Sequence, residues 1–84
     1  SVLIKHMSDF HLAEEILLQA AREVVGHIIK ETGQEPFVRV EFADNGIRMR
    51  LRYKTFAMDR QRISSDIAKK IISRFREEEG VQFV

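Results

Sequence analysis

The sequence predicts an α+β domain with two helices packed on one face of an antiparallel sheet, and three observations support this fold class. Two long segments repeat apolar residues at three- and four-residue steps, as amphipathic helices do. Between them, two segments of alternating apolar and polar residues flank Asp44-Asn45-Gly46, the pattern of a β-hairpin. Short apolar segments at the two ends add a first and a last strand. The order strand, helix, strand, strand, helix, strand is that of the ferredoxin-like βαββαβ fold.

The 84 residues are enough for one domain, residues 1–84, which buries about two-thirds of the surface that the unfolded chain exposes. Its 14 basic and 13 acidic residues nearly cancel, so the overall charge indicates no particular partner. Because there is no cysteine, a disulfide framework, a thiolate zinc site and a cysteine nucleophile are excluded. Both ends of the sequence are apolar, and we therefore expect the domain to be excised from a longer protein.

The first strand is expected at Val2–Lys5 and the first helix at Phe10–Glu31, a helix about 33 Å long. Met7-Ser8-Asp9 supplies side chains for the N-cap, and Gly33 is placed to end the helix. A close packing contact is expected at Gly26, since a glycine inside a helix costs about 1 kcal/mol relative to alanine. The predicted buried stripe consists of Ala13, Ile16, Leu17, Ala20, Ala21, Val24 and Ile28.

The hairpin strands are expected at Phe37–Ala43 and Ile47–Phe56, joined by a two-residue Asn45-Gly46 loop. This loop pairs Phe42 with Met49, Val40 with Leu51 and Val38 with Tyr53. A three-residue loop would pair Phe42 with Arg48 and exchange the two faces of the strand, so the two-residue loop is favoured. In the second strand the residues that then face the core are Ile47, Met49, Leu51 and Tyr53.

A second helix is expected at Arg60–Glu79, with Asp59 as its N-cap and Gly80 at its end. Within it, Asp66 precedes Lys70 by one turn, which is the favourable order for an ion pair. Residues 81–84 are expected to form the last strand. The predicted buried stripe of this helix consists of Ile63, Ile67, Ala68, Ile71, Ile72 and Phe75.

The sequence contains no recognisable catalytic, cofactor or metal site, and we expect the domain not to be an enzyme. All four glycines are taken up by helix ends, the turn and the first helix, so no phosphate-binding loop is indicated. His11 and Glu15 lie one helical turn apart with Asp9 nearby, but a zinc site needs three or four ligands. Ser8, Asp9 and His11 are residue types of a catalytic triad, yet they lie in one capping segment.

The outer face of the hairpin is the candidate site. It is a charged face, expected to be either solvated or a salt-bridged protein interface, that consists of Arg39, Glu41, Arg48, Arg50, Arg52 and Lys54. Like charges two residues apart lie about 7 Å from each other, so their repulsion in water is small. Ferredoxin-like sheets that bind RNA stack bases on aromatic residues of this face, whereas here Phe37 at the edge is the nearest aromatic residue. Nucleic acid is therefore not expected as a partner, and a free-standing module that binds RNA or a small regulatory ligand is the alternative.

The hairpin Asp44-Asn45-Gly46-Ile47-Arg48-Met49-Arg50-Leu51-Arg52-Tyr53 resembles the hairpin in the C-terminal α/β domain of the mechanosensitive channel of small conductance (MscS) family. Arg60-Gln61-Arg62-Ile63-Ser64-Ser65-Asp66-Ile67 and Gly80-Val81-Gln82-Phe83 are similar to the second helix and the following strand of that domain. The resemblance spans residues 12–84. It departs from the family at Lys54, where an apolar residue is usual, and at His6-Met7-Ser8-Asp9, the entry to the first helix.

The resemblance implies that this domain belongs to the cytoplasmic vestibule, or cage, of an osmotically gated ion channel. In that family seven subunits form the cage beneath the pore, so the implied partners are other copies of the same subunit. The implied location is the cytoplasmic side of the cell membrane, with membrane contact only through transmembrane segments that this sequence does not contain. The implied role is assembly, filtering or gate modulation during osmotic-shock ion release, without catalysis or a cofactor.

Overall fold

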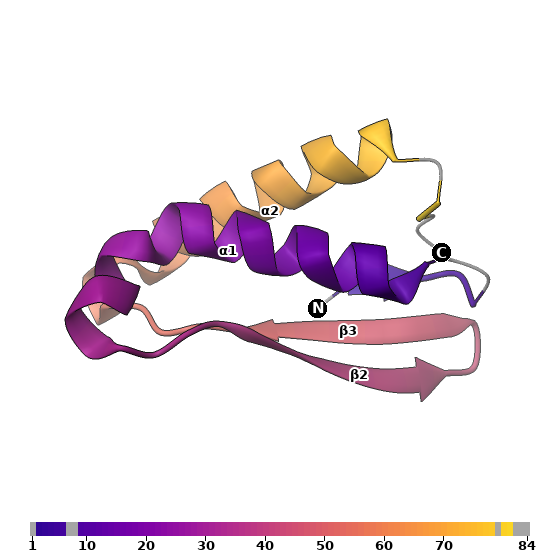
Figure 1. Ribbon diagram of the computed structural model, residues 1–84, viewed down its shortest axis with the longest axis horizontal. Helices are drawn as coiled ribbons and strands as arrows, with labels where there is room; N and C mark the ends of the chain where they lie inside the picture. The colour runs from indigo at the N-terminus through magenta and orange to yellow at the C-terminus, as the bar shows by residue number, and fades with distance from the viewer. Residues whose placement is uncertain (1, 7–8, 79, 82–84) are drawn as a thin grey trace.

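The computed structural model describes residues 2–6, 9–78 and 80–81 as two helices packed against a three-stranded antiparallel sheet (Figure 1). The α+β class predicted from the sequence is therefore confirmed. In Figure 1 both helices lie on the same side of the β2–β3 hairpin. The elements along the chain are β1 (Val2–Ile4), α1 (Phe10–Thr32), β2 (Phe37–Ala43), β3 (Gly46–Arg52), the 3₁₀ turn η1 (Ala57–Asp59) and α2 (Arg60–Glu77).

The strands are ordered β1-β3-β2, and both neighbouring pairs are antiparallel. In the hairpin, Ala43 pairs with Gly46, so Asp44 and Asn45 form the turn in place of the predicted Asn45-Gly46. Phe42 consequently lies opposite Ile47, not Met49. The predicted register is thus wrong by two residues, but a two-residue shift leaves each side chain on its predicted face.

Capping residues define both ends of helix α1. The Asp9 carboxylate accepts a hydrogen bond from the backbone N–H of Leu12 at 3.2 Å, which confirms Asp9 as the N-cap. Met7 and Ser8, the other predicted cap residues, lie outside the described residues. At the other end Gly33 adopts the left-handed conformation, with φ of 70°, and its N–H donates to the Ile29 carbonyl at 2.8 Å.

Gly26 has no packing contact of the kind the sequence predicted. A Cβ atom added at this position would meet no described atom within 4 Å beyond its chain neighbours and the backbone of its own helix. The neighbouring Val25 has non-helical dihedral angles, φ of −105° and ψ of 18°, so α1 is kinked there. The glycine therefore marks a weak point of the helix, because glycine lowers helix stability and is common at kinks.

We expect alanine to have opposite effects at these two glycines. Gly26→Ala should raise the free energy of unfolding by up to about 1 kcal/mol, because alanine favours the helix and has open space. Gly33→Ala should lower it by about 1 kcal/mol, because a side chain is strained at positive φ. Chemical denaturation of the two variants checks this. A loss of stability in Gly26→Ala would show that the space at the kink is filled.

Helix α2 begins at the predicted residue, but Asp59 does not cap it in the predicted way. Its side chain makes no hydrogen bond to the backbone of the first turn. Instead the Asp59 carboxylate forms an ion pair with Arg62, at 3.2 Å from Nη2. The helix ends at Glu77, two residues before the predicted end, and the N–H of Glu78 donates to the Phe75 carbonyl.

Glu23 links the two helices through cations on α2. Its carboxylate forms an ion pair with Arg74 and lies 3.5 Å from Nζ of Lys70. The hydrogen bond from Arg74 and the charges of both cations hold the pKa of the Glu23 carboxyl below its ordinary value. Lys70 thus pairs across the helix interface, and not with Asp66 as the helical spacing had suggested.

The core lies between the helices and the inner face of the sheet. Val25 is buried where the periodicity had predicted Val24, and two predicted core residues of α2, Ala68 and Ile72, are exposed. Of the predicted last strand only Val81 is among the described residues, and its side chain is buried. The buried apolar residues are Ile4, Ala13, Ile16, Leu17, Ala20, Ala21, Val25, Ile28, Ile47, Met49, Ile63, Ile67, Ile71, Phe75 and Val81.

Candidate interface on the sheet and its edges

The outer face of the sheet is the side opposite the helices, and it carries the predicted charged residues. Strand alternation places Arg39 and Glu41 of β2 and Arg48, Arg50 and Arg52 of β3 on this side. Their β3 neighbours Ile47 and Met49 are buried on the other side. Five of the six predicted site residues are therefore brought together on one face. The sixth, Lys54, is exposed and follows the end of β3.

Glu41 is the acid that partly neutralises this face. It lies opposite Arg48, whereas the predicted register placed it opposite Arg50. Its Oε1 atom nevertheless pairs with both cations, at 3.5 Å from Nη1 of Arg48 and 3.1 Å from Nη2 of Arg50. All three side chains are about half exposed, and exposed ion pairs contribute only about 0–1 kcal/mol. The pairs therefore orient these side chains more than they stabilise the fold.

The half of this face nearer to Phe37 carries uncompensated positive charge. Arg39 lies opposite Arg50, and its guanidinium stands 5.8 Å from the centre of the Phe37 ring. Arg52 lies opposite Phe37 and has no ion-pair partner within residues 2–6, 9–78 and 80–81. A shallow hollow on this face is lined by Arg39, Val40, Glu41, Arg50 and Arg52. This arrangement suits the acidic groups of another molecule.

β2 exposes apolar side chains on the face that the helices cover elsewhere. Phe42 is 87% exposed and Val40 45% exposed, although the predicted register had paired both with core-facing residues of the second strand. The His6 ring lies 6.3 Å from the Phe42 ring and is its nearest aromatic neighbour among the described residues. Alternation identifies the inner face of a strand, but it does not tell whether a helix reaches that far. No signal in the sequence distinguished Phe42 from the covered residues of β3.

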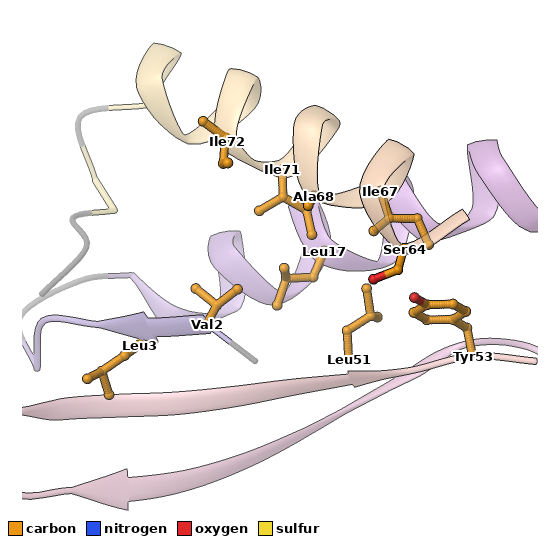
Figure 2. A pocket seen from close by; sticks show the side chains of 10 residues that line it. All are labelled: Val2, Leu3, Leu17, Leu51, Tyr53, Ser64, Ile67, Ala68, Ile71 and Ile72. Carbon is orange, nitrogen blue, oxygen red and sulfur yellow. The ribbon is translucent and has the colours of Figure 1, made fainter. Parts of the chain in front are cut away.

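An apolar groove of about 380 Å³ runs between α2 and the sheet (Figure 2). In the described part of the chain β1 pairs with residues 47–49 of β3, and no described strand lies beside Leu51 and Tyr53 on that side, so the groove is open there. Ala68 and Ile72, which the sequence assigned to the core, line this groove. The other lining residues are Val2, Leu3, Leu17, Leu51, Tyr53, Ser64, Ile67 and Ile71.

The residues considered for chemistry lie around the start of α1. No group of three or more His, Asp or Glu side chains able to hold a metal ion is found in the described part of the chain. His11 packs its ring 4.1 Å from the ring of Phe10, and Asp9 is engaged in capping α1. Ser8 lies outside the described residues. Among residues 2–6, 9–78 and 80–81, no helix has the length and hydropathy of a membrane span.

Comparisons with protein-family models, with curated proteins and with solved structures give no match to this chain. The surface of the described residues has three distinct parts. That surface combines a cationic sheet face, an exposed apolar edge on β2 and an apolar groove beside α2.

Proposed function

We propose that this chain is a cytoplasmic cage domain of a channel of the MscS family and serves the assembly of its subunits. The observation that carries the proposal is the sequence of the hairpin, Asp44 to Tyr53, in which apolar residues and arginines alternate as in that family. In the structure this segment turns its apolar residues to the core and its arginines to the outer face. The arginines of such a face would contribute charge to the wall of a cage while they stay outside the core.

The proposal includes the ferredoxin-like fold. The order β1-β3-β2 with both helices on one side agrees with three of the four strands of that fold. The fourth strand would be formed by residues 81–84 beside β1, of which Val81 is buried. NMR of the isotope-labelled chain would test this. Strand pairing brings backbone protons of residues 82–84 close to backbone protons of β1, and nuclear Overhauser effects detect such short distances. Their absence would remove this part of the proposal.

In a cage of seven subunits, the outer face of this sheet would act as a hydrated or salt-bridged wall. Arg39 and Arg52 make no ion pair within the described chain and are available to acidic groups of a neighbouring subunit or to passing anions. Glu41 limits the net positive charge by pairing with Arg48 and Arg50. The domain would filter what passes through the cage and support the assembly of the subunits. Ion conduction would belong to pore segments elsewhere in the full-length protein.

The full-length protein provides the test of this assignment. We expect the reading frame upstream of Ser1 to encode several apolar stretches of about 20 residues, the length that spans a membrane. We also expect native mass spectrometry of the protein extracted from membranes to give a complex of seven subunits. A reading frame without such stretches, or a protein that is extracted as a monomer, would contradict the proposal.

A module that binds RNA is the second candidate, and the cationic half of the outer face beside Phe37 favours it. Phe37 is 50% exposed and could stack a base while Arg39, Arg50 and Arg52 contact phosphates. Binding of single-stranded RNA would then weaken steeply between two salt concentrations, because phosphate contacts release counterions. Binding that is absent or independent of salt would contradict this second candidate.

A further inference from the structure

The outer edge of β2 has the geometry of an unpaired strand. Among residues 2–6, 9–78 and 80–81 the sheet order is β1-β3-β2, so β2 is an outermost strand there, and its pairing with β3 is continuous from Phe37 to Ala43 without a bulge. No proline lies inside the strand. Natural proteins protect such an edge with a proline, a bulge, charged side chains or a covering loop. Of these, the edge of β2 has charged side chains, Arg39 and Glu41, but they are of opposite sign and can therefore complement those of a second copy.

Alternate residues of β2 direct their backbone N–H and C=O groups toward the open edge. Ala43 and Gly46 flank the two-residue turn, so in this pair both residues direct their N–H and C=O groups at each other. The direction alternates along an antiparallel strand. Val38, Val40 and Phe42 therefore direct their N–H and C=O groups away from β3, toward the open edge.

We propose that a second copy of this chain pairs with this edge, β2 against β2, in an antiparallel two-fold dimer centred on Val40. A two-fold pair places residue i opposite residue j and j opposite i. Centred on Val40, it sets Arg39 opposite the partner's Glu41 and Glu41 opposite the partner's Arg39. The central pair, Val40 with the partner's Val40, uses the backbone groups that point outward.

The exposed apolar residues of β2 become mutual neighbours in this arrangement. Phe42 lies opposite the partner's Val38, and both side chains are on the face toward the helices. Phe42 and Val40 are exposed because no helix covers this end of the strand, so the space above them is open to the second copy. The two sheets join into one, and the apolar strip that each copy exposes is partly covered.

Charge fixes the register of the pair. If the two-fold axis passed through Arg39, this residue would face the partner's Arg39, and an axis through Glu41 would bring two carboxylates together. Both arrangements place like charges directly opposite each other, which is destabilising. Both also centre the pair on residues whose backbone groups are already directed at β3. Axes through Val38 or Phe42 would also use outward-directed backbone groups, but neither sets Arg39 or Glu41 opposite a residue of opposite charge. The axis at Val40 does so for both residues.

This dimer is independent of the proposed cage. A ring of subunits requires two different patches on each copy, whereas a two-fold contact uses the same patch twice and closes on itself. The β2 edge would therefore join two free domains or domains of two separate assemblies. Whether or not the full-length protein forms a ring, the pairing is tested on the 84-residue chain alone.

The test is sedimentation equilibrium of the chain at concentrations up to about 1 mM, since a small interface gives weak association. We expect the unchanged chain to dimerise. Arg39→Glu, which removes no ion pair within the chain, should weaken the dimer about tenfold, because two opposite-charge pairs become like-charge pairs. Arg52→Glu makes the same change of charge on β3 of the same face and should leave dimerisation unchanged.

Mixing two variants gives the decisive result. Glu41→Arg should also pair with itself more weakly than the unchanged chain does, but together with Arg39→Glu it restores every opposite-charge pair across the edge. We expect an equimolar mixture to form heterodimers at least as readily as the unchanged chain, while Glu41→Arg mixed with Arg52→Glu does not. A chain that stays monomeric at about 1 mM, or equal pairing in both mixtures, would overturn the proposal.

Discussion

Replacing Met49 by aspartate is expected to abolish the folded state. Met49 is fully buried in the central strand, between Val2 of β1 and Val40 of β2. Removing the side chain costs about 2–5 kcal/mol, and a carboxyl buried without a partner adds several kcal/mol, whether charged or protonated. A domain of this size has a total stability of about 4–13 kcal/mol. Circular dichroism with thermal unfolding should therefore show no cooperative transition.

Arg52→Glu is the control for this prediction, because it introduces an acid on the opposite face of the same strand. Arg52 is exposed and makes no ion pair within the described chain, so its replacement should change the free energy of unfolding by less than about 0.5 kcal/mol. If Met49→Asp folded normally while Arg52→Glu unfolded the domain, the assignment of the two faces of β3 would be reversed.

The second large effect is expected for Leu17→Ala in α1. Leu17 is fully buried between α2 and the sheet, and removing its side chain leaves a cavity. Leucine-to-alanine changes of this kind lower the free energy of unfolding by about 2–5 kcal/mol. Urea denaturation measures this loss as a lower midpoint with an unchanged slope.

Leu18→Ala removes the same atoms one residue further along the helix. Leu18 is only partly buried and lies off the stripe that faces the sheet, so we expect a loss below about 1 kcal/mol. Equal losses in the two variants would show that α1 is rotated relative to the packing described above.

The helices were predictable from the sequence because their limits depend on nearby residues. Asp9 caps α1 through a hydrogen bond to a backbone group three residues away, and Gly33 ends it through its own conformation. The core stripe of α1 was also predictable, apart from the region of the kink. At Val25 the dihedral angles leave the helical range, and burial moves from Val24 to Val25. A strict helical period does not include such a break.

The hairpin shows which part of a register the sequence can determine. Alternation separated the buried Ile47 and Met49 from the exposed arginines, because a shift of one residue would have exchanged them. A shift of two residues leaves this pattern unchanged, so alternation could not choose between turns at Asp44-Asn45 and Asn45-Gly46. The structure places the turn at Asp44-Asn45. Among the described residues only Gly33 has a positive φ, so the turn contains no residue with positive φ.

The edges of the sheet were the part of the candidate site that the sequence did not predict. Val40 and Phe42 have the same apolar alternation as buried residues, yet the helices do not cover them. Ala68 and Ile72 continue the apolar stripe of α2, but β1 is too short to close the groove beneath them. Such exposure depends on how far neighbouring elements extend, which local periodicity does not encode. The cationic outer face, by contrast, was predictable from alternation alone.

The most direct test of the proposed channel function is electrical. The full-length protein, reconstituted in a lipid bilayer, is studied by patch clamp while suction raises the membrane tension. The cage-domain proposal predicts ionic currents that are absent at rest and appear above a threshold of tension. It equally predicts that the protein restores survival of osmotic downshock in cells lacking their own mechanosensitive channels. A correctly inserted full-length protein that passes no current at any tension short of membrane rupture would contradict it.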